Sequence, residues 1–185
     1  RNTVWSLDSG IGKAYCLHWA PSVDLMFCAG KQEVVAFSLD EAAKGPNWDS
    51  RWLTNTELLS LNCLSWYSAQ GLLFAAGSHE RYITGKVIAL DAKTGKEQWA
   101  ALPPTGAVLC SCCAEDHPML FCGGNHAKVA ALDPSSGEQH WSVDPEVGES
   151  RQFGVYADPG VTCIALAKAS GQLLCGGSLG RIAAL

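Results

Sequence analysis

Cysteines are the residues of this 185-residue chain best able to do chemistry, because thiolates bind zinc and thiol pairs form disulfides. The chain has nine cysteines, and only Cys110 and Cys113 have C-x-x-C spacing, without the second such pair that a four-cysteine zinc site needs. Seven recur at two positions of a repeated unit: Cys16, Cys28, Cys63, Cys110, Cys122, Cys163 and Cys175. A hairpin centred near residue 22 would place Cys16 opposite Cys28, so cross-strand disulfides stay open as an alternative. The odd count and the lack of a visible secretory leader favour reduced thiols in the cytoplasm.

The other candidate groups form no recognisable active site. Cys112 and Cys113 are adjacent, but both also fit as ordinary strand residues. His117 and His126 flank one expected strand and, at about 3.3 Å per residue, lie too far apart for one metal ion. The chain has no P-loop or G-x-G-x-x-G motif, and its Ser, His and Asp residues show no spacing typical of a catalytic triad. We therefore predict no catalytic residue, no metal site and no cofactor.

Composition is that of a folded domain, with 48% hydrophobic and 17% charged residues and a net charge of −5. The basic residues are scattered, which argues against a nucleic-acid partner. No uninterrupted apolar run approaches the length of a membrane span. The expected partners are therefore other protein chains, or the remainder of the chain's own fold, which the repeats described next predict to be a propeller.

Four copies of one unit account for the whole chain. Their leading cysteines are Cys16, Cys63, Cys110 and Cys163, and each is followed by a glycine 14 residues later: Gly30, Gly77, Gly124 and Gly177. Tryptophans precede the first three cysteines by 11 residues (Trp5, Trp52 and Trp99), and the fourth unit has Trp141 further upstream. A period of roughly 40 to 50 residues is typical of propeller blades.

Each unit predicts four short strands, because apolar runs are bounded by turn residues and no helical period appears. The glycine that ends the second strand would let backbones approach closely. One such sheet cannot bury both faces alone, so we predict an all-β propeller of four-stranded antiparallel blades. The predicted boundaries are a last strand of a preceding blade at 1–8, blades at 9–54, 55–101 and 102–143, and a partial blade at 157–185. The ends could close a four-blade ring between them, or, as we prefer, the chain is part of a larger ring.

Two segments carry a family resemblance. Residues 89–99 read ALDAKTGKEQW and residues 131–141 read ALDPSSGEQHW. They resemble the tryptophan-docking motif of quinoprotein-like propellers, and the second-strand pattern is similar to that of WD-repeat propellers. The resemblance implies that the tryptophans pack between blades and that Asp91 and Asp133 tie the turn before them. The first unit departs from the motif between Asp40 and Trp52.

The resemblance also offers an alternative function. Quinoprotein dehydrogenases carry adjacent cysteines beside pyrroloquinoline quinone, so the chain could be a fragment of such an enzyme or a ligand-binding propeller. Cys113, however, stands where Trp19 and Trp66 stand in their units, and no calcium-ligand set surrounds it.

Two insertions favour a different function. One lies in Ser78–Gly85 and the other in Val143–Val161, and strand alternation places both on one face of the ring. They contain His79, Arg81, Tyr82, Arg151, Phe153 and Tyr156, including residue types enriched at interface hot spots. The predicted function is a non-catalytic scaffold that binds proteins through this face, within a larger intracellular protein or assembly.

Overall fold

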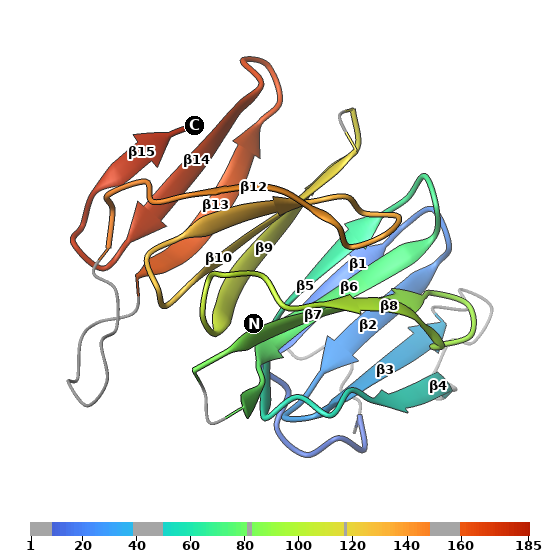
Figure 1. The fold of residues 1–185 in the computed structure, drawn as a ribbon. Helices are drawn as coiled ribbons and strands as arrows, with labels where there is room; N and C mark the ends of the chain where they lie inside the picture. Colours follow the sequence, from blue (N-terminus) through green and yellow to red (C-terminus); the bar gives the residue numbers. More distant parts are fainter. Residues whose placement is uncertain (1–8, 39–49, 81–82, 117, 149–159) are drawn as a thin grey trace, which may run out of the picture.

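The structure is a computed structural model that describes residues 9–38, 50–80, 83–116, 118–148 and 160–185. Its described residues form fifteen β-strands and no α-helix (Figure 1). The all-β prediction is confirmed.

The strands form four antiparallel sheets in chain order. The first sheet contains β1 (Cys16–Ala20), β2 (Leu25–Ala29), β3 (Glu33–Ser38) and β4 (Ser50–Asn55). The second contains β5 (Ser60–Tyr67), β6 (Leu72–Ser78), β7 (Gly85–Asp91) and β8 (Glu97–Ala101). The third contains β9 (Val108–Ala114), β10 (Met119–Gly124), β11 (Val129–Leu132) and β12 (Gln139–Val143). The fourth contains β13 (Val161–Ala167), β14 (Gln172–Gly177) and β15 (Ile182–Ala184).

The hairpin between the first two strands of each sheet fixes the position of the cysteines. In the first sheet the pairing is Cys16 with Ala29 and Leu17 with Cys28, one residue away from the predicted register. The reason is the turn, which spans the four residues between Ala20 and Leu25, so that its centre falls between two residues. A shift of one residue moves the second cysteine to the opposite face of the sheet. The alternative of cross-strand disulfides is therefore excluded, and all nine cysteines are free.

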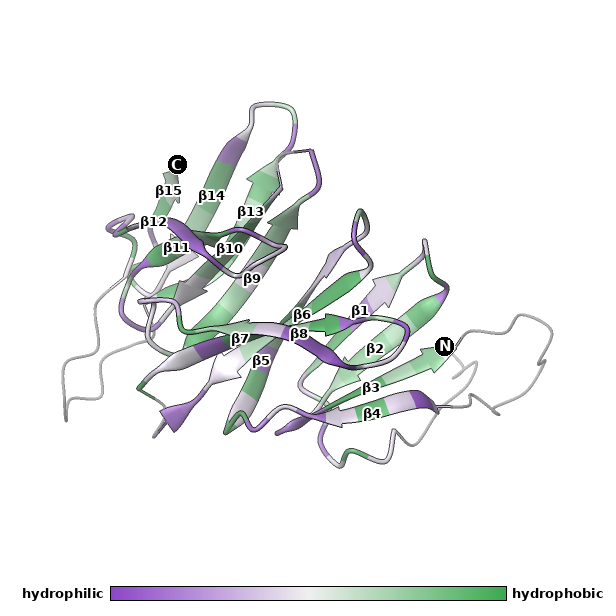
Figure 2. Ribbon diagram, turned by 45° about the vertical axis from the view of Figure 1, so that its right-hand side comes forward, coloured by the Kyte–Doolittle hydropathy of each residue, from purple (hydrophilic) through white to green (hydrophobic). Residues whose placement is uncertain are grey.

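The sheets stand side by side in sequence order. The first strands β1, β5, β9 and β13 contact one another in turn, and the fourth strands lie away from this row (Figure 1). Side chains bridge neighbouring first strands: the Asn62 amide donates to the Val108 carbonyl at 2.6 Å, and the hydroxyls of Ser65 and Ser111 are hydrogen-bonded. The first and fourth sheets consequently form the two ends of the arrangement (Figure 2).

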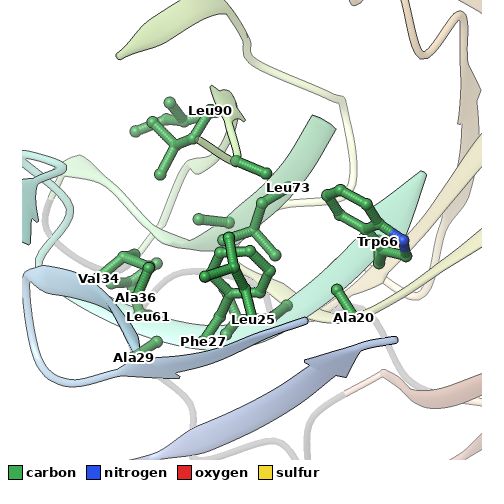
Figure 3. Close-up of a cluster of buried hydrophobic side chains, with 14 of the residues drawn as sticks. Ala20, Leu25, Phe27, Ala29, Val34, Ala36, Leu61, Trp66, Leu73 and Leu90 are labelled. Atoms are coloured by element: carbon green, nitrogen blue, oxygen red, sulfur yellow. The ribbon is translucent and has the colours of Figure 1, made fainter. Parts of the chain in front are cut away.

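The hydrophobic core lies between the sheets and is divided into layers. Between the first and second sheets, Phe27 lies with its ring centroid 6.0 Å from that of Trp66, among the side chains shown in Figure 3. A second cluster joins the second and third sheets, and a third joins the third and fourth. Strand β6 is buried along its whole length because both faces of its sheet are covered.

Candidate interaction surface

Two of the repeat tryptophans dock onto a turn of the next sheet. The Trp52 indole N–H donates to the Ala92 carbonyl at 2.8 Å, and its ring lies against Gly95, where a Cβ would come within 2.6 Å. The Trp99 indole N–H donates likewise to the Pro134 carbonyl at 3.1 Å. Each turn therefore receives the tryptophan of the preceding sheet. Trp141 is 37% exposed.

An aspartate organises each of these turns. The Asp91 carboxylate accepts hydrogen bonds from the Thr94 hydroxyl at 2.7 Å and from the amides of Thr94 and Lys93. The Thr94 hydroxyl is the main cause of a lowered Asp91 pKa, although partial desolvation opposes it. Asp133 accepts the corresponding bonds from Ser135 and Ser136. Desolvation is the largest single contribution and raises the pKa of Asp133. The hydrogen bonds and nearby His140 together outweigh it, so this pKa is lowered too.

The glycine that ends each second strand lies against the segment that enters its own sheet. A Cβ on Gly77 would come within 1.9 Å of the Ser60 carbonyl oxygen, which leaves no room for any other residue. A Cβ on any of the equivalent glycines would come within 2.4 to 3.0 Å of a backbone oxygen: Gly30, Gly124 and Gly177. These contacts bring each entry segment next to the loop between the second and third strands of its sheet.

These segments and loops together form one face, which we call the loop face. It consists of the connections from the second to the third strand and from the fourth strand to the next sheet. The connection between β6 and β7, residues 79–84, is longer than its three counterparts. Its base is closed by a hydrogen bond from the His79 amide to the Thr84 carbonyl, and His79 is half-buried.

The longest connection of the loop face, between β12 and β13, has a pinned base. A Cβ on Gly148 would come within 2.3 Å of the Gly160 carbonyl oxygen, so the two ends of this loop lie together. The carbonyls of Val147 and Gly160 accept the amides of Leu179 and Ser178, which tie the base to the β14–β15 loop. Both insertions thus begin and end on the same face as neighbouring loops.

The loop face also carries exposed apolar side chains that the sequence analysis did not identify. Ile83 is 36% exposed, Leu102 65% and Leu179 44%. The opposite face, formed by the turns between the first and second and the third and fourth strands, exposes no large apolar side chain in its described residues. These exposed residues could have been found in the sequence as apolar residues in the connections between predicted strands, since such connections are normally polar.

Most of the predicted contact residues lie outside the described residues: Arg81, Tyr82, Arg151, Phe153 and Tyr156. Trp5 of the repeat lies outside them as well. Their contribution to the loop face therefore stays a prediction.

Several of the cysteines lie in environments that favour the neutral thiol. Burial raises the pKa of Cys63 to about 11 and that of Cys113 to about 12. Cys112 and Cys113 are adjacent in strand β9, so their side chains point to opposite faces of the sheet. The side chain of Cys113 packs between the second and third sheets. In the described part of the chain, no three His, Cys, Asp or Glu side chains gather as metal ligands would. The alternative of a pyrroloquinoline quinone enzyme gains no support from these described residues.

Known proteins with this architecture share its repeat. Residues 83–174 match the family model described as Outer membrane protein assembly factor BamB. The solved structure of BamB from Moraxella catarrhalis is 20% identical, with a TM-score of 0.64 over 92% of this chain and 44% of that chain. A chain in the crystal structure of a mitotic checkpoint complex is 14% identical, with a TM-score of 0.67 over 95% and 49%. No curated protein sequence matches.

These similarities define the class of protein. The chain has the β-propeller fold, as the repeat predicted. It spans somewhat less than half the length of either solved structure. No helix that could cross a membrane occurs in the described residues.

The predicted cytoplasmic location is wrong. The matching family model is that of an outer membrane protein assembly factor, and BamB is also among the similar structures. The prediction relied on an odd number of cysteines, but these thiols pack inside strands as small apolar groups. A thiol retained for packing does not report the redox state of its compartment.

Proposed function

We propose that this propeller is a scaffold that binds another protein chain through its loop face. The observation that carries the proposal is the asymmetry between the two faces. Ile83, Leu102 and Leu179 are exposed on the loop face, and the face with the turns exposes no comparable side chain in its described residues.

The packing beneath this face supports the proposal. The entry segments contact the glycines at the ends of the second strands, and the bases of both long loops are closed by backbone contacts. A rigid base lowers the conformational entropy lost on binding, which favours affinity. BamB is described as an assembly factor, and the second similar structure is that of a complex. Their descriptions agree with a role in which a propeller contacts other proteins.

The contacts we expect combine the exposed apolar residues with Arg81, Tyr82, Arg151 and Phe153 of the two insertions. Aromatic and arginine side chains dominate the binding energy of many interfaces, whereas the surrounding contacts mainly exclude water. Catalysis is not part of the proposal, because Cys112 and Cys113 do not form a paired site.

A quantitative pulldown from the source cells tests this function. We compare the wild-type chain with a triple variant, Ile83→Asp, Leu102→Asp and Leu179→Asp, and with a second variant in which Arg81, Tyr82, Arg151 and Phe153 are alanine. Each should reduce recovery of bound proteins by a factor of roughly 10 or more. The control is Ala169→Asp, which adds a charge to an exposed turn on the opposite face. Equal recovery by all four proteins would show that the loop face is not the binding surface.

A further inference from the structure

Connections of the loop face that belong to different sheets are in direct backbone contact. A Cβ on Gly85, which follows the β6–β7 connection, would come within 2.2 Å of the Gly106 carbonyl oxygen in the β8–β9 connection. The Thr105 carbonyl in turn accepts the amide of His126, in the β10–β11 connection, at 2.9 Å. These three connections therefore lie against one another through their backbones.

The same line of contacts continues to the fourth sheet. A Cβ on Gly160, which ends the long β12–β13 connection, would come within 2.5 Å of the Ala127 amide nitrogen. The Gly160 carbonyl accepts the amide of Ser178, in the β14–β15 connection, at 3.1 Å. The central residues of this line, which we call the seam, are Gly106, Asn125, His126, Ala127 and Gly160. The seam thus joins connections of the second, third and fourth sheets.

The seam contains two features that destabilise the folded state. Asn125 is 4% exposed, and its side-chain oxygen is, among the described residues, the one buried side-chain oxygen or nitrogen without a hydrogen-bond partner. This oxygen is directed at Gly106, where a Cβ would come within 2.1 Å of it. Ala127 has a φ of +57°, in the left-handed region that residues other than glycine rarely adopt. A buried acceptor without a donor and a left-handed alanine each cost free energy.

The position of these two features favours a role in binding. Backbone strain and unsatisfied buried polar groups persist where the surrounding structure imposes them, and they cluster at functional sites. Here both occur in the β10–β11 connection, between the two longest connections of the loop face. Backbone packs directly on backbone at Gly106 and Gly160, so the seam fixes the separation of the connections that it joins.

We propose, on the basis of the function proposed for the loop face, that the seam holds Ile83, Leu102 and Leu179 as one surface for a single folded protein domain. A partner that contacts Ile83 and Leu179 together gains affinity, because its second contact forms within the complex. This gain requires a partner that is rigid over the same span, since a flexible segment would lose entropy on ordering. Asn125 and Ala127 are both buried, so they act as positioning residues that do not touch the partner.

The first test compares the two ends of this surface. Ile83→Asp and Leu179→Asp are made separately, and the proteins that each variant binds from the source cells are quantified by mass spectrometry. Both variants should lose the same proteins, each by a factor of roughly 10 or more, because either change removes one of two linked contacts. Ala169→Asp, in an exposed turn on the opposite face, is the control.

The outcomes separate this inference from the proposed function. Loss of different proteins by the two variants would overturn the single partner, although the loop face would still be a binding surface. No loss from either variant would contradict the proposed function itself and the inference with it.

The second test loosens the seam without changing any exposed residue. Ala127→Gly tolerates the left-handed backbone and gives the segment more conformational freedom. It should reduce recovery of the same proteins by a factor of roughly 3 to 10, because more entropy is then lost on binding. The matched control is Asp24→Gly, which replaces a residue with a φ of +55° in an exposed turn on the opposite face. It should leave recovery unchanged.

Two further measurements separate positioning from general destabilisation. The melting temperature of Ala127→Gly should not fall below that of the wild type, because glycine relieves the left-handed strain. Hydrogen exchange at the Leu179 amide, which donates to the Val147 carbonyl, should be faster in Ala127→Gly and unchanged in Asp24→Gly. Unchanged recovery and exchange in Ala127→Gly would overturn the role of the seam. So would a loss of binding matched by a loss of stability, since it would show a merely structural role.

Discussion

The second and fourth sheets are built from the same repeat, yet they differ in what covers them. Strand β6 of the second sheet is buried at every position, whereas β14 of the fourth alternates between exposed and buried residues. The side chains are similarly apolar, so composition does not cause the difference. In this fold most strand residues are buried by the neighbouring sheet, and in the described residues the fourth sheet has such a neighbour on one face only.

The turns of the two central sheets also depend on contacts with a neighbouring sheet. The β7–β8 turn of the second sheet holds Trp52 of the first, and the turn of the third sheet holds Trp99 of the second. Each of these two sheets is therefore stabilised at its outer edge by a residue that belongs to its predecessor. A destabilising substitution in a central sheet should therefore affect two interfaces between sheets, whereas one in an end sheet should affect a single interface.

The largest expected difference concerns the residue at the centre of the second strand. Phe74→Ala should lower the free energy of unfolding by about 3–5 kcal/mol, because it opens a cavity between covered sheets. In the monomer, Leu174→Ala should lower the free energy of unfolding by less than about 1 kcal/mol, because the side chain is already in contact with water. Urea titrations of both variants measure the difference. Equal losses would mean that the end sheet is as well packed as the central one.

A smaller difference concerns two glycines in turns. Gly95 and Gly171 both have φ close to +70°, so either alanine variant incurs a cost of about 1–2 kcal/mol for a left-handed backbone. At Gly95 the new Cβ would also lie 2.6 Å from the ring of Trp52, whereas at Gly171 nothing lies within 4 Å. Gly95→Ala should therefore cost about 1–3 kcal/mol more than Gly171→Ala.

Thermal unfolding with tryptophan fluorescence tests this pair. The Gly95→Ala variant should also shift the emission of Trp52, because its indole leaves the turn. Gly171→Ala is the control for the backbone cost alone. Identical stabilities would indicate that Trp52 is not held by the turn.

Much of the fold could be predicted from the sequence because repetition made each position visible several times. The leading cysteines and the glycines 14 residues later marked the first and second strands of every sheet. The register of the hairpins could not be predicted to the residue, since a four-residue turn and a three-residue turn differ by one position. That single residue decided whether Cys16 could meet Cys28.

The candidate site was predictable only in part. Loop length predicted the loop face as the candidate, because strand alternation assigns every connection to one side. The exposure of Leu102 and Leu179 depends on what the neighbouring segments leave uncovered, and the pattern of a single strand does not contain this information. The exposure of the fourth sheet could not be predicted for the same reason, because Leu174 occupies a position of the repeat that is buried in the other sheets.

The smallest expected effect concerns the aspartate that shapes the turn of the second sheet. Asp91 has a lowered pKa in the folded chain, mainly because its carboxylate accepts the Thr94 hydroxyl. A folded-state pKa below the unfolded one means that the ionised group stabilises the fold at pH values above the unfolded pKa. This contribution is lost as the pH falls from the ordinary aspartate value through the lowered one. The effect is small, since the turn is exposed and solvent screens it.

Asp91→Asn should therefore lower the melting temperature at pH 7, and the difference from wild type should shrink as the pH falls towards 3. Thr94→Ala removes the main hydrogen bond and should reproduce part of the same pH dependence. Ser136→Ala is the matched change in the third sheet, where the hydroxyl bond to Asp133 is longer, at 3.2 Å against 2.7 Å. It should produce a weaker effect than Thr94→Ala, because a longer hydrogen bond contributes less. A difference that stays constant from pH 7 to 3 would show that Asp91 acts through its shape and not its charge.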